Sequence, residues 1–564
     1  MKFLSLFAST LLGLAQAAPS PSNDLSSRQT IPGLARCNNA TFSAVLTKFR
    51  GSFRPNSPYT SSTEPYPDAE KVLFWANVAP LSIPDICGMR VTVRGNITFE
   101  MYLPSPARWN RRFLTVGNGG FAGGTSRYDL FSRAVHGWAV MSTNVGHEAN
   151  ITDGLSWAGG NQSLQIDWAW RAMADSVPFA KEMVAAYYGE VTTVRNYYSG
   201  CSTGGRQGIR QIEVNPDSFD GMLIGAPAWN VKSAMPVISR IGWIAQAYGL
   251  QVPDRTLLER IYNRVNEICT VLGFDNTAAD GVVRDTAECL STFKASGVTG
   301  PVWSGLDCAD TLDCVTIPQR QGFMALLEEF KLPPQNQSYA GDGVDITSIK
   351  DLFTFLGGSQ PTDFDQQFSR YFLNETIVWD SDENGARLIS RSNEWDAEVR
   401  ANANASILNG WSGKTILYTG TADATVSSLG TRRAFGMAGG IGNNNLAFFE
   451  LPGMPHCVNS GTGGDNPPWY IGGTGLASVS PSNLWYMPNT TTPALNNAEH
   501  DALHALTEWV EGPNSSKPTQ LIATAFNNWG PGFTIAKERP ICAAPMRQDY
   551  VSGNADAKGS WRCV

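Results

Sequence analysis

The sequence predicts an α/β fold in which helices cover a largely parallel sheet and a long insertion interrupts the chain. Short apolar runs at residues 112–116, 138–142 and 221–225 are followed by glycine or small polar residues, as is typical of buried parallel strands. A stretch with helical periodicity at residues 165–188 separates these runs. Strands that alternate with helices imply crossover connections within one sheet.

The same alternation continues through the rest of the chain. We expect a strand at residues 194–198, a helix at 208–213, two more strands at 414–418 and 445–451, and a closing helix around 501–511.

The region between residues 230 and 405 differs, because it combines helical segments with long polar loops and four cysteines. We interpret it as an insertion, so that residues 18–229 and 406–564 together form the α/β core and residues 230–405 interrupt it. A chain of 564 residues is too long for one compact core, which agrees with this division.

Residues 1–17 are predicted to be a secretory signal peptide. Lys2 precedes an apolar run over residues 3–14, and the small residues Ala15 and Ala17 fit a cleavage site. The alternative is a membrane anchor, but the run is shorter than the ~20 residues that span a bilayer. The ten cysteines also fit an oxidising compartment. We therefore expect a secreted, extracellular protein.

Asn-x-Ser/Thr acceptors for N-glycosylation are numerous and predict a glycoprotein. They begin at Asn39, Asn96, Asn150, Asn161, Asn336, Asn374, Asn404, Asn489 and Asn514. The net charge of −8 argues against nucleic acid and anionic membranes as partners.

A candidate catalytic triad follows three of the expected strands. Ser202 lies in a Gly-x-Ser-x-Gly motif at residues 200–204, between a strand and a helix, as in a nucleophile elbow. A serine hydroxyl also needs a base and a carboxylate that orients the base. Asp423 and His456 follow the next suitable strands, and the chain order Ser, Asp, His is that of α/β hydrolases. Taken singly, Asp423 could be a turn residue and His456 a loop residue.

Two cysteines flank the proposed nucleophile and base. Cys201 precedes Ser202, and Cys457 follows His456. A disulfide between them would hold their Cα atoms within roughly 4.4 to 6.8 Å and bring serine and histidine together. The alternative is that each cysteine belongs to an unrelated structural bridge.

His500 and His504 lie four residues apart on the closing helix, a spacing that also occurs in zinc sites. No third ligand follows at a useful distance, so we favour an amphipathic helix over a metal site. His136 and His147 follow apolar runs, and we expect structural roles for them.

The motifs at residues 200–208, 219–221 and 225–228, together with Asp423 and the His456–Cys457 pair, resemble the tannase and feruloyl esterase family. The resemblance spans nearly the whole mature chain. It implies an α/β-hydrolase core with a large inserted lid, a serine carboxylic ester hydrolase acting on phenolic esters, and no organic cofactor. Oligomeric state stays open.

The resemblance favours a feruloyl esterase that releases hydroxycinnamic acids from plant cell-wall polysaccharide esters. A tannase that hydrolyses galloyl esters is the alternative within the family. A catalytically inert secreted carbohydrate-binding protein is the alternative from another class, since fold does not fix function. Aromatic lid residues could stack on a phenolic ring or form the core of the lid: Trp243, Tyr248, Phe353, Phe355 and Phe372.

The resemblance also assigns backbone groups and disulfides. The oxyanion donors are the backbone N–H groups of Thr203 and Gly120, positions that agree with α/β-hydrolase mechanics. Cys201 pairs with Cys457. The remaining implied pairs are Cys37–Cys87, Cys269–Cys289, Cys308–Cys314 and Cys542–Cys563.

A calcium loop in the lid is common in the family, but this sequence departs from its pattern. The first aspartate is absent and the spacing is altered, which leaves Asp275, Asp280 and the carbonyl of Val282 as candidate ligands. Calcium takes six to eight oxygen ligands, so a filled and an empty site are both open alternatives.

Overall fold

The computed structural model describes residues 34–55, 86–149, 154–189, 193–250, 256–272, 282–308, 314–329, 343–349, 352, 363–457, 469–472, 497–512, 516–526 and 535–564. The predicted signal peptide lies outside these residues, as do Asp275 and Asp280 of the expected calcium site.

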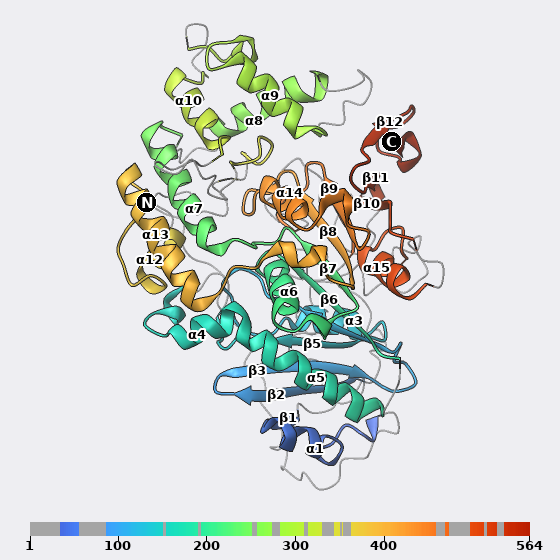
Figure 1. Ribbon diagram of the computed structural model, residues 1–564. Helices are drawn as coiled ribbons and strands as arrows, with labels where there is room; N and C mark the ends of the chain where they lie inside the picture. Colours follow the sequence, from blue (N-terminus) through green and yellow to red (C-terminus); the bar gives the residue numbers. More distant parts are fainter. Residues whose placement is uncertain are drawn as a thin grey trace, which may run out of the picture.

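Among the described residues, nine strands form one central sheet (Figure 1). Across the sheet the order is β1 (Ser52–Pro55), β2 (Ile86–Arg94), β3 (Ile97–Pro104), β5 (Ala139–Thr143), β4 (Arg112–Val116), β6 (Arg195–Cys201), β7 (Gly221–Gly225), β8 (Lys414–Gly420) and β9 (Leu446–Leu451). The strands from β5 to β9 are parallel, which confirms the predicted α/β fold. The antiparallel strands β1 to β3 extend one edge and were not predicted.

Helices cover both faces of this sheet. One face packs on α1 (Asn39–Phe49), α5 (Ala172–Tyr188) and α6 (Thr203–Val214), and the other on α3 (Arg127–Ala134) and α15 (Ala502–Glu511). Neighbouring strand residues alternate between the two hydrophobic clusters, so that Phe113 joins the first and Leu114 the second. Because these strands are buried on both sides, their sequences are continuous apolar runs.

The helix predicted at residues 165–188 is interrupted near its start. Helix α4 (Gln162–Ile166) continues into a π-helical turn at Asp167–Arg171 before α5 begins. At this turn the buried Arg206 donates through Nη1 to the carbonyl of Ala169 over 2.8 Å. Wide turns of this kind arise where an extra group engages the backbone, and an arginine so far along the chain could not be anticipated from the helical pattern.

Between β7 and β8 the chain forms the helices of the expected insertion. They are α7 (Val231–Ala247), α8 (Thr256–Leu272), α9 (Thr286–Ser296), α10 (Ile317–Leu326), α12 (Asp363–Tyr371) and α13 (Asp382–Val399). In Figure 1, α8, α9 and α10 lie together above the sheet, whereas α12 and α13 lie beside α7 and close to α4.

The hydrophobic core of the insertion also contains residues from outside it. Leu155, Ala158 and Trp168, which precede the proposed nucleophile in sequence, join the same buried cluster as the lid helices. Gln367 of α12 reinforces this contact by accepting a hydrogen bond from the N–H of Leu155 over 2.7 Å. The lid is therefore packed onto the segment that carries α4 and the π-helical turn.

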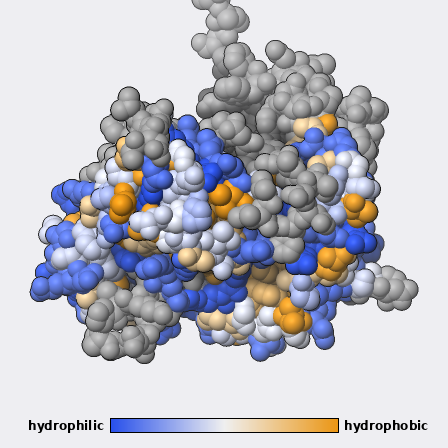
Figure 2. Space-filling view, turned by 90° about the horizontal axis from the view of Figure 1, so that it is seen from above, coloured by the Kyte–Doolittle hydropathy of each residue, from blue (hydrophilic) through white to orange (hydrophobic). Residues whose placement is uncertain are grey.

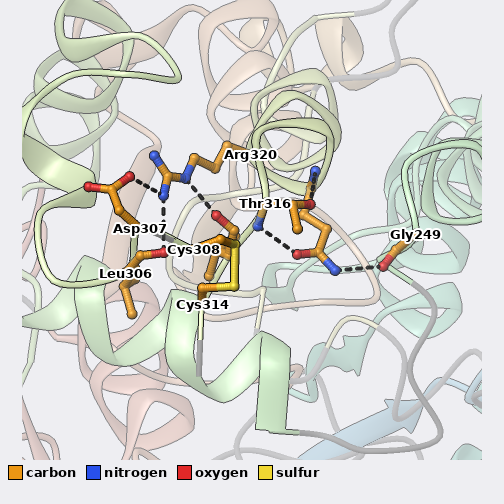
Figure 3. Close-up of a disulfide and its surroundings, with 9 residues drawn as sticks. Gly249, Leu306, Asp307, Cys308, Cys314, Thr316 and Arg320 are labelled. Carbon is orange, nitrogen blue, oxygen red and sulfur yellow. Dashed lines mark hydrogen bonds and ion pairs between the residues drawn. A yellow bond between two sulfur atoms is a disulfide. The ribbon is translucent and has the colours of Figure 1, made fainter. Parts of the chain in front are cut away.

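A disulfide and a buried arginine fix the outer part of the lid (Figure 3). Cys308 pairs with Cys314, and Arg320 lies beside the bridge with 3% of its surface exposed. Its guanidinium donates to the carbonyls of Leu306 and Val315 at 3.0 and 2.9 Å and pairs with Asp307 at 2.6 Å. One arginine thus holds together the two chain segments that the disulfide joins.

The C-terminal region adds two antiparallel pairs that the sequence did not predict. Strand β10 (Gln520–Phe526) pairs with β11 (Ile535–Cys542), and β12 (Gln548–Tyr550) pairs with β13 (Trp561–Cys563). The disulfide Cys542–Cys563 joins the two pairs. The predicted closing helix is present as α15, which starts after the N-cap residue Asp501.

In the space-filling view of Figure 2, hydrophobic residues on the described surface are scattered among hydrophilic ones. The large apolar side chains that are exposed in the described part of the chain are Ile317, Met437, Ile441, Val551 and Val564. None of the helices in the described ranges has the length and apolar character needed to cross a bilayer.

Candidate active site

Ser202 lies in a strained turn between β6 and α6. Its φ of 62° and ψ of −125° are outside the regions that non-glycine residues prefer. The turn is held by backbone bonds, because the N–H of Ser202 donates to Gly225 over 3.0 Å and its carbonyl accepts from Ala228 over 3.0 Å. Strain of this kind persists only where the surroundings enforce it, and it presents the serine side chain at the carboxyl edge of the sheet.

Close backbone approach explains the glycines of the motif. A Cβ atom on Gly205 would lie 2.7 Å from the carbonyl oxygen of Gly225, and one on Gly204 would lie 3.1 Å from that of Asn118. Tyr198 adds a 2.5 Å hydrogen bond from its hydroxyl to the carbonyl of Gly204. The first turn of α6 can pack against the neighbouring loops only because Gly204 and Gly205 have no side chains.

Asp423 and His456 meet at the ends of the next two strands. The Nδ1 atom of His456 lies 2.6 Å from Oδ2 of Asp423. The other carboxylate oxygen accepts from the N–H groups of Thr425 and Val426 at 2.9 and 2.8 Å, and Asp423 is 1% exposed. A buried carboxylate with fixed donors keeps its orientation, so Nδ1 carries the proton and Nε2 is left as an acceptor, the state that a general base requires.

The sheet register brings Ser202 to the same edge. Cys201 pairs with Gly225 in β7, Gly225 with Tyr418 in β8, and Gly420 with Leu451 in β9. The three candidate residues therefore follow strands that end side by side.

The Cys201–Cys457 disulfide connects the serine and histidine segments directly. Their Cα atoms are 5.8 Å apart although 256 positions separate the two cysteines in sequence. All ten cysteines are described and paired, and the other bridges are Cys37–Cys87, Cys269–Cys289, Cys308–Cys314 and Cys542–Cys563. These are the five pairs that the family resemblance implies.

The two backbone segments expected to hold an oxyanion also lie together. Thr203 is the first residue of α6, where backbone N–H groups have no partner within the helix. The loop with Gly120, at φ 54°, starts after β4 and contacts α6 through a 2.9 Å bond from the N–H of Asn118 to Oε1 of Gln207. The loop with Gly120 and the first turns of α6 are therefore in contact, as the expected pair of donors requires.

Arg206, one turn into α6, is fully buried and was not singled out in the sequence. It donates to the carbonyls of Ala169 and Ala401 at 2.8 and 2.7 Å, and its guanidinium lies 4.4 Å from the ring centre of Trp168. Burial lowers its pKa to about 10. It ties the nucleophile helix to the π-helical turn and to the end of the lid, which only the tertiary structure reveals.

A small cavity next to Asp423 was also not foreseen. Its volume is about 100 Å³, and it lies between α7 of the lid and the loop that carries Asp423. Its apolar lining includes Pro227, Val237, Ile241 and Val426.

The aromatic lid residues have different environments. Phe372 is buried in a cluster with Phe121 and Trp168, with ring centres 5.4 and 5.9 Å away, whereas Trp243 and Tyr248 are partly buried. Phe353 and Phe355 lie outside the described residues. Phe372 is thus packed as lid core, and Phe121 is an aromatic neighbour of Gly120 that the sequence did not single out.

The candidate metal ligands do not form a site in the described structure. Nε2 of His500 lies 3.1 Å from Glu538, and Nδ1 lies 3.2 Å from Asn497. Burial lowers the pKa of His504. Of the calcium candidates only Val282 is described, and within the described ranges no three His, Cys, Asp or Glu residues are grouped as metal ligands would be.

Comparisons with known proteins agree with this architecture. A family model described as "Tannase and feruloyl esterase" matches residues 87–367. The chain is 28% identical to a probable feruloyl esterase B-1 of Aspergillus flavus over 504 residues, covering 85% of this chain and 86% of the relative. A probable feruloyl esterase B-2 of Aspergillus fumigatus is also 28% identical, with the same coverage.

Two solved structures share the fold. The crystal structure of feruloyl esterase B from Aspergillus oryzae has a TM-score of 0.70 at 24% identity, covering 91% of this chain and 96% of the other. A tannin acyl hydrolase from Aspergillus niger has a TM-score of 0.61 at 18% identity, covering 91% and 90%.

Proposed function

The chain belongs to the tannase and feruloyl esterase family and is a carboxylic ester hydrolase, and we propose from this that it is a secreted feruloyl esterase with Ser202 as nucleophile. The observation that carries the catalytic assignment is the 2.6 Å contact between His456 and Asp423, in a segment tied to Ser202 by the Cys201–Cys457 disulfide. An inert binding protein would not need this arrangement.

The first half of the proposed reaction forms an acyl-enzyme. The Ser202 hydroxyl oxygen bonds to the ester carbonyl carbon while Nε2 of His456 takes its proton. The carbonyl oxygen becomes an oxyanion, to which the N–H groups of Thr203 and Gly120 donate. The bond to the alcohol oxygen then breaks, and His456 returns the proton to this leaving group. Asp423 stabilises the charged imidazole throughout.

Water completes the cycle by the same route in reverse. His456 removes a proton from water as the water oxygen attacks the acyl carbon. The bond between the acyl carbon and Ser202 breaks, and the proton returns to the serine oxygen. The products are a carboxylic acid and an alcohol.

Hydroxycinnamoyl esters of plant cell-wall polysaccharides are the proposed substrates, because the named relatives are feruloyl esterases. The apolar cavity between α7 and the Asp423 loop supports an ester with a hydrophobic portion. The lid at residues 230–405 would then cover a site built by the core at residues 18–229 and 406–564. Secretion is supported by the N-terminal leader pattern and by the paired cysteines.

Substrate assignment is tested by comparing kcat/KM on methyl ferulate and methyl gallate. We expect the ferulate ester to be preferred. A strong preference for gallate would replace the proposed activity with that of a tannase.

The serine mechanism is tested separately with Ser202→Ala. We expect kcat to fall by about 10⁶-fold and labelling by an organophosphonate to be lost, because the triad acts as a unit. Near-native turnover in this variant would overturn the assignment of the nucleophile, and absence of labelling in the unmodified protein would favour an inert fold.

A further inference from the structure

A second strained turn lies next to the proposed oxyanion loop, directly after β5. Val145 has a φ of 50° and is 1% exposed, although a β-branched residue rarely adopts positive φ. Asn144 supports the turn, since its side-chain oxygen accepts from the N–H groups of Gly146 and Thr98 at 3.0 and 2.9 Å. Such strain clusters at functional sites, but none of these residues belongs to the triad.

The turn places the side chain of His147 against the loop after β4 that contains Gly120 and Phe121. Its Nε2 atom lies 3.1 Å from the carbonyl oxygen of Phe121, and its Nδ1 atom lies 3.5 Å from that of Val145. Burial lowers the pKa of His147, so the imidazole is neutral and has a single N–H group. We assign the proton to Nε2, because this contact is the shorter one; His147 then donates to Phe121.

Phe121 directly follows Gly120, whose N–H is a proposed oxyanion donor. Backbone bonds already join the two loops, from Gly123 to Ala149 and from Gly124 to His147, both at 2.9 Å. These bonds lie beyond Phe121 in the chain. Closer to Gly120, the N–H of Ala122 donates to the carbonyl of Gly119 over 3.1 Å and closes a turn around Gly120 and Phe121. The His147 side chain adds the contact that ties this turn to the neighbouring loop.

The ring of His147 also packs on aromatic side chains that contact the lid, namely Trp157 and, through it, Phe372. It stacks on Trp157 with ring centres 3.7 Å apart and an interplanar angle of 16°. Trp157 in turn contacts Phe372, between α12 and α13 of the lid, edge to face at 5.6 Å. The orientation of His147 is therefore fixed from two sides, by a strained backbone and by aromatic packing.

We propose that His147 is a positioning residue that holds the Gly120–Phe121 backbone so that the N–H of Gly120 points at the developing oxyanion. This role rests on the proposed esterase function. An oxyanion donor acts mainly in the transition state, so loss of its orientation lowers kcat and leaves KM nearly unchanged.

Two amide variants separate a positioning role from a merely structural one. The amide nitrogen of Gln in His147→Gln can occupy the place of Nε2 and keep the donor to Phe121. In His147→Asn the amide nitrogen lies near the place of Nδ1 and cannot reach the carbonyl oxygen of Phe121. Replacing the exposed His136 by Gln, away from both loops, is the matched control.

We expect His147→Asn to lower kcat on methyl ferulate by at least about tenfold with KM changed less than about twofold, on the scale of losses for misdirected oxyanion donors. His147→Gln should recover most of this loss, and His136→Gln should match the unmodified protein. Turnover is expressed per serine labelled at the end point of organophosphonate reaction, so that misfolded protein is not counted.

Equal kcat values for the two His147 variants, whether both normal or both low, would overturn the proposal, as would a loss confined to KM. The Ser202→Ala variant separates failure of the proposed esterase function from failure of the His147 role. If that variant remains active, the serine mechanism fails; if it is inactive while both His147 variants turn over normally, only the role of His147 fails.

Discussion

The imidazole of His456 and the carboxylate of Asp423 are joined by a 2.6 Å contact, and the carboxylate is also fixed by two backbone N–H groups. Replacing Asp423 by Asn keeps an acceptor for those N–H groups but turns an amide donor toward Nδ1. His456 is then forced into the tautomer with its proton on Nε2, which cannot accept a proton from Ser202. We expect kcat on methyl ferulate to fall by about 10⁴-fold. A loss of less than tenfold would contradict the role of Asp423.

We expect the Cys201–Cys457 disulfide to support kcat directly, in addition to any contribution to the stability of the fold. In a Cys201→Ser, Cys457→Ser double variant, Ser202 and His456 lose their covalent connection, and small displacements of reacting groups are costly. We expect kcat to fall by about 10- to 100-fold. The matched control is the Cys542→Ser, Cys563→Ser variant, which removes a bridge of similar Cα separation, 5.5 Å, away from the triad. Equal losses of kcat in the two variants would contradict a specific role.

Arg320 is expected to stabilise the lid. Replacement by Met removes the donors to the carbonyls of Val298 and Val315, whereas the carbonyl of Leu306 keeps its 2.9 Å bond from the N–H of Val315. Arg320 is 3% exposed, and each buried acceptor that is left without a partner costs about 1–3 kcal/mol. The free energy of unfolding from denaturant titration should fall by at least about 2 kcal/mol. Arg387→Met on the surface of α13 is the control, because its ion pair with Glu375 is exposed. Equal stabilities of the two variants would show that the Arg320 bonds contribute little.

Stability should decrease on mild acidification because of His147 and His504. Burial lowers the pKa of both side chains in the folded protein, so the unfolded chain binds protons more readily. The free energy of unfolding therefore falls as the pH decreases below about 6.5, the ordinary pKa of histidine. His504→Gln should make this dependence shallower between pH 7 and 5. Parallel stability profiles for the variant and the unmodified protein would exclude a contribution from His504.

The central part of the fold could be predicted because its signals are local. Strands such as β7 are buried on both faces and appear as short apolar runs, and the motif around Ser202 combines a strand, a tight turn and a helix. Helix α6 begins earlier than expected, at Thr203 rather than residue 208, because glycines that are poor helix formers are needed there for close packing.

Other features depend on residues that are distant in sequence. The π-helical turn accompanies the bond from Arg206, and the contact of His147 with Phe121 joins two loops after different strands. The antiparallel strands β2 and β3 are mostly buried, but the paired charges of Arg90 and Glu100 interrupt their apolar runs. In each case the deciding interaction is tertiary, so periodicity and motif spacing could not reveal it.

The hydrophobic cluster that the lid shares with the core limits which chain segments could be exchanged between related enzymes. Leu155, Ala158 and Trp168 pack with the lid helices, although they precede Ser202 in the chain. A chimera that grafted residues 230–405 alone onto a different core would separate these partners and expose their apolar surfaces to water. An insertion transferred with its packing intact therefore has to be accompanied by residues 154–172.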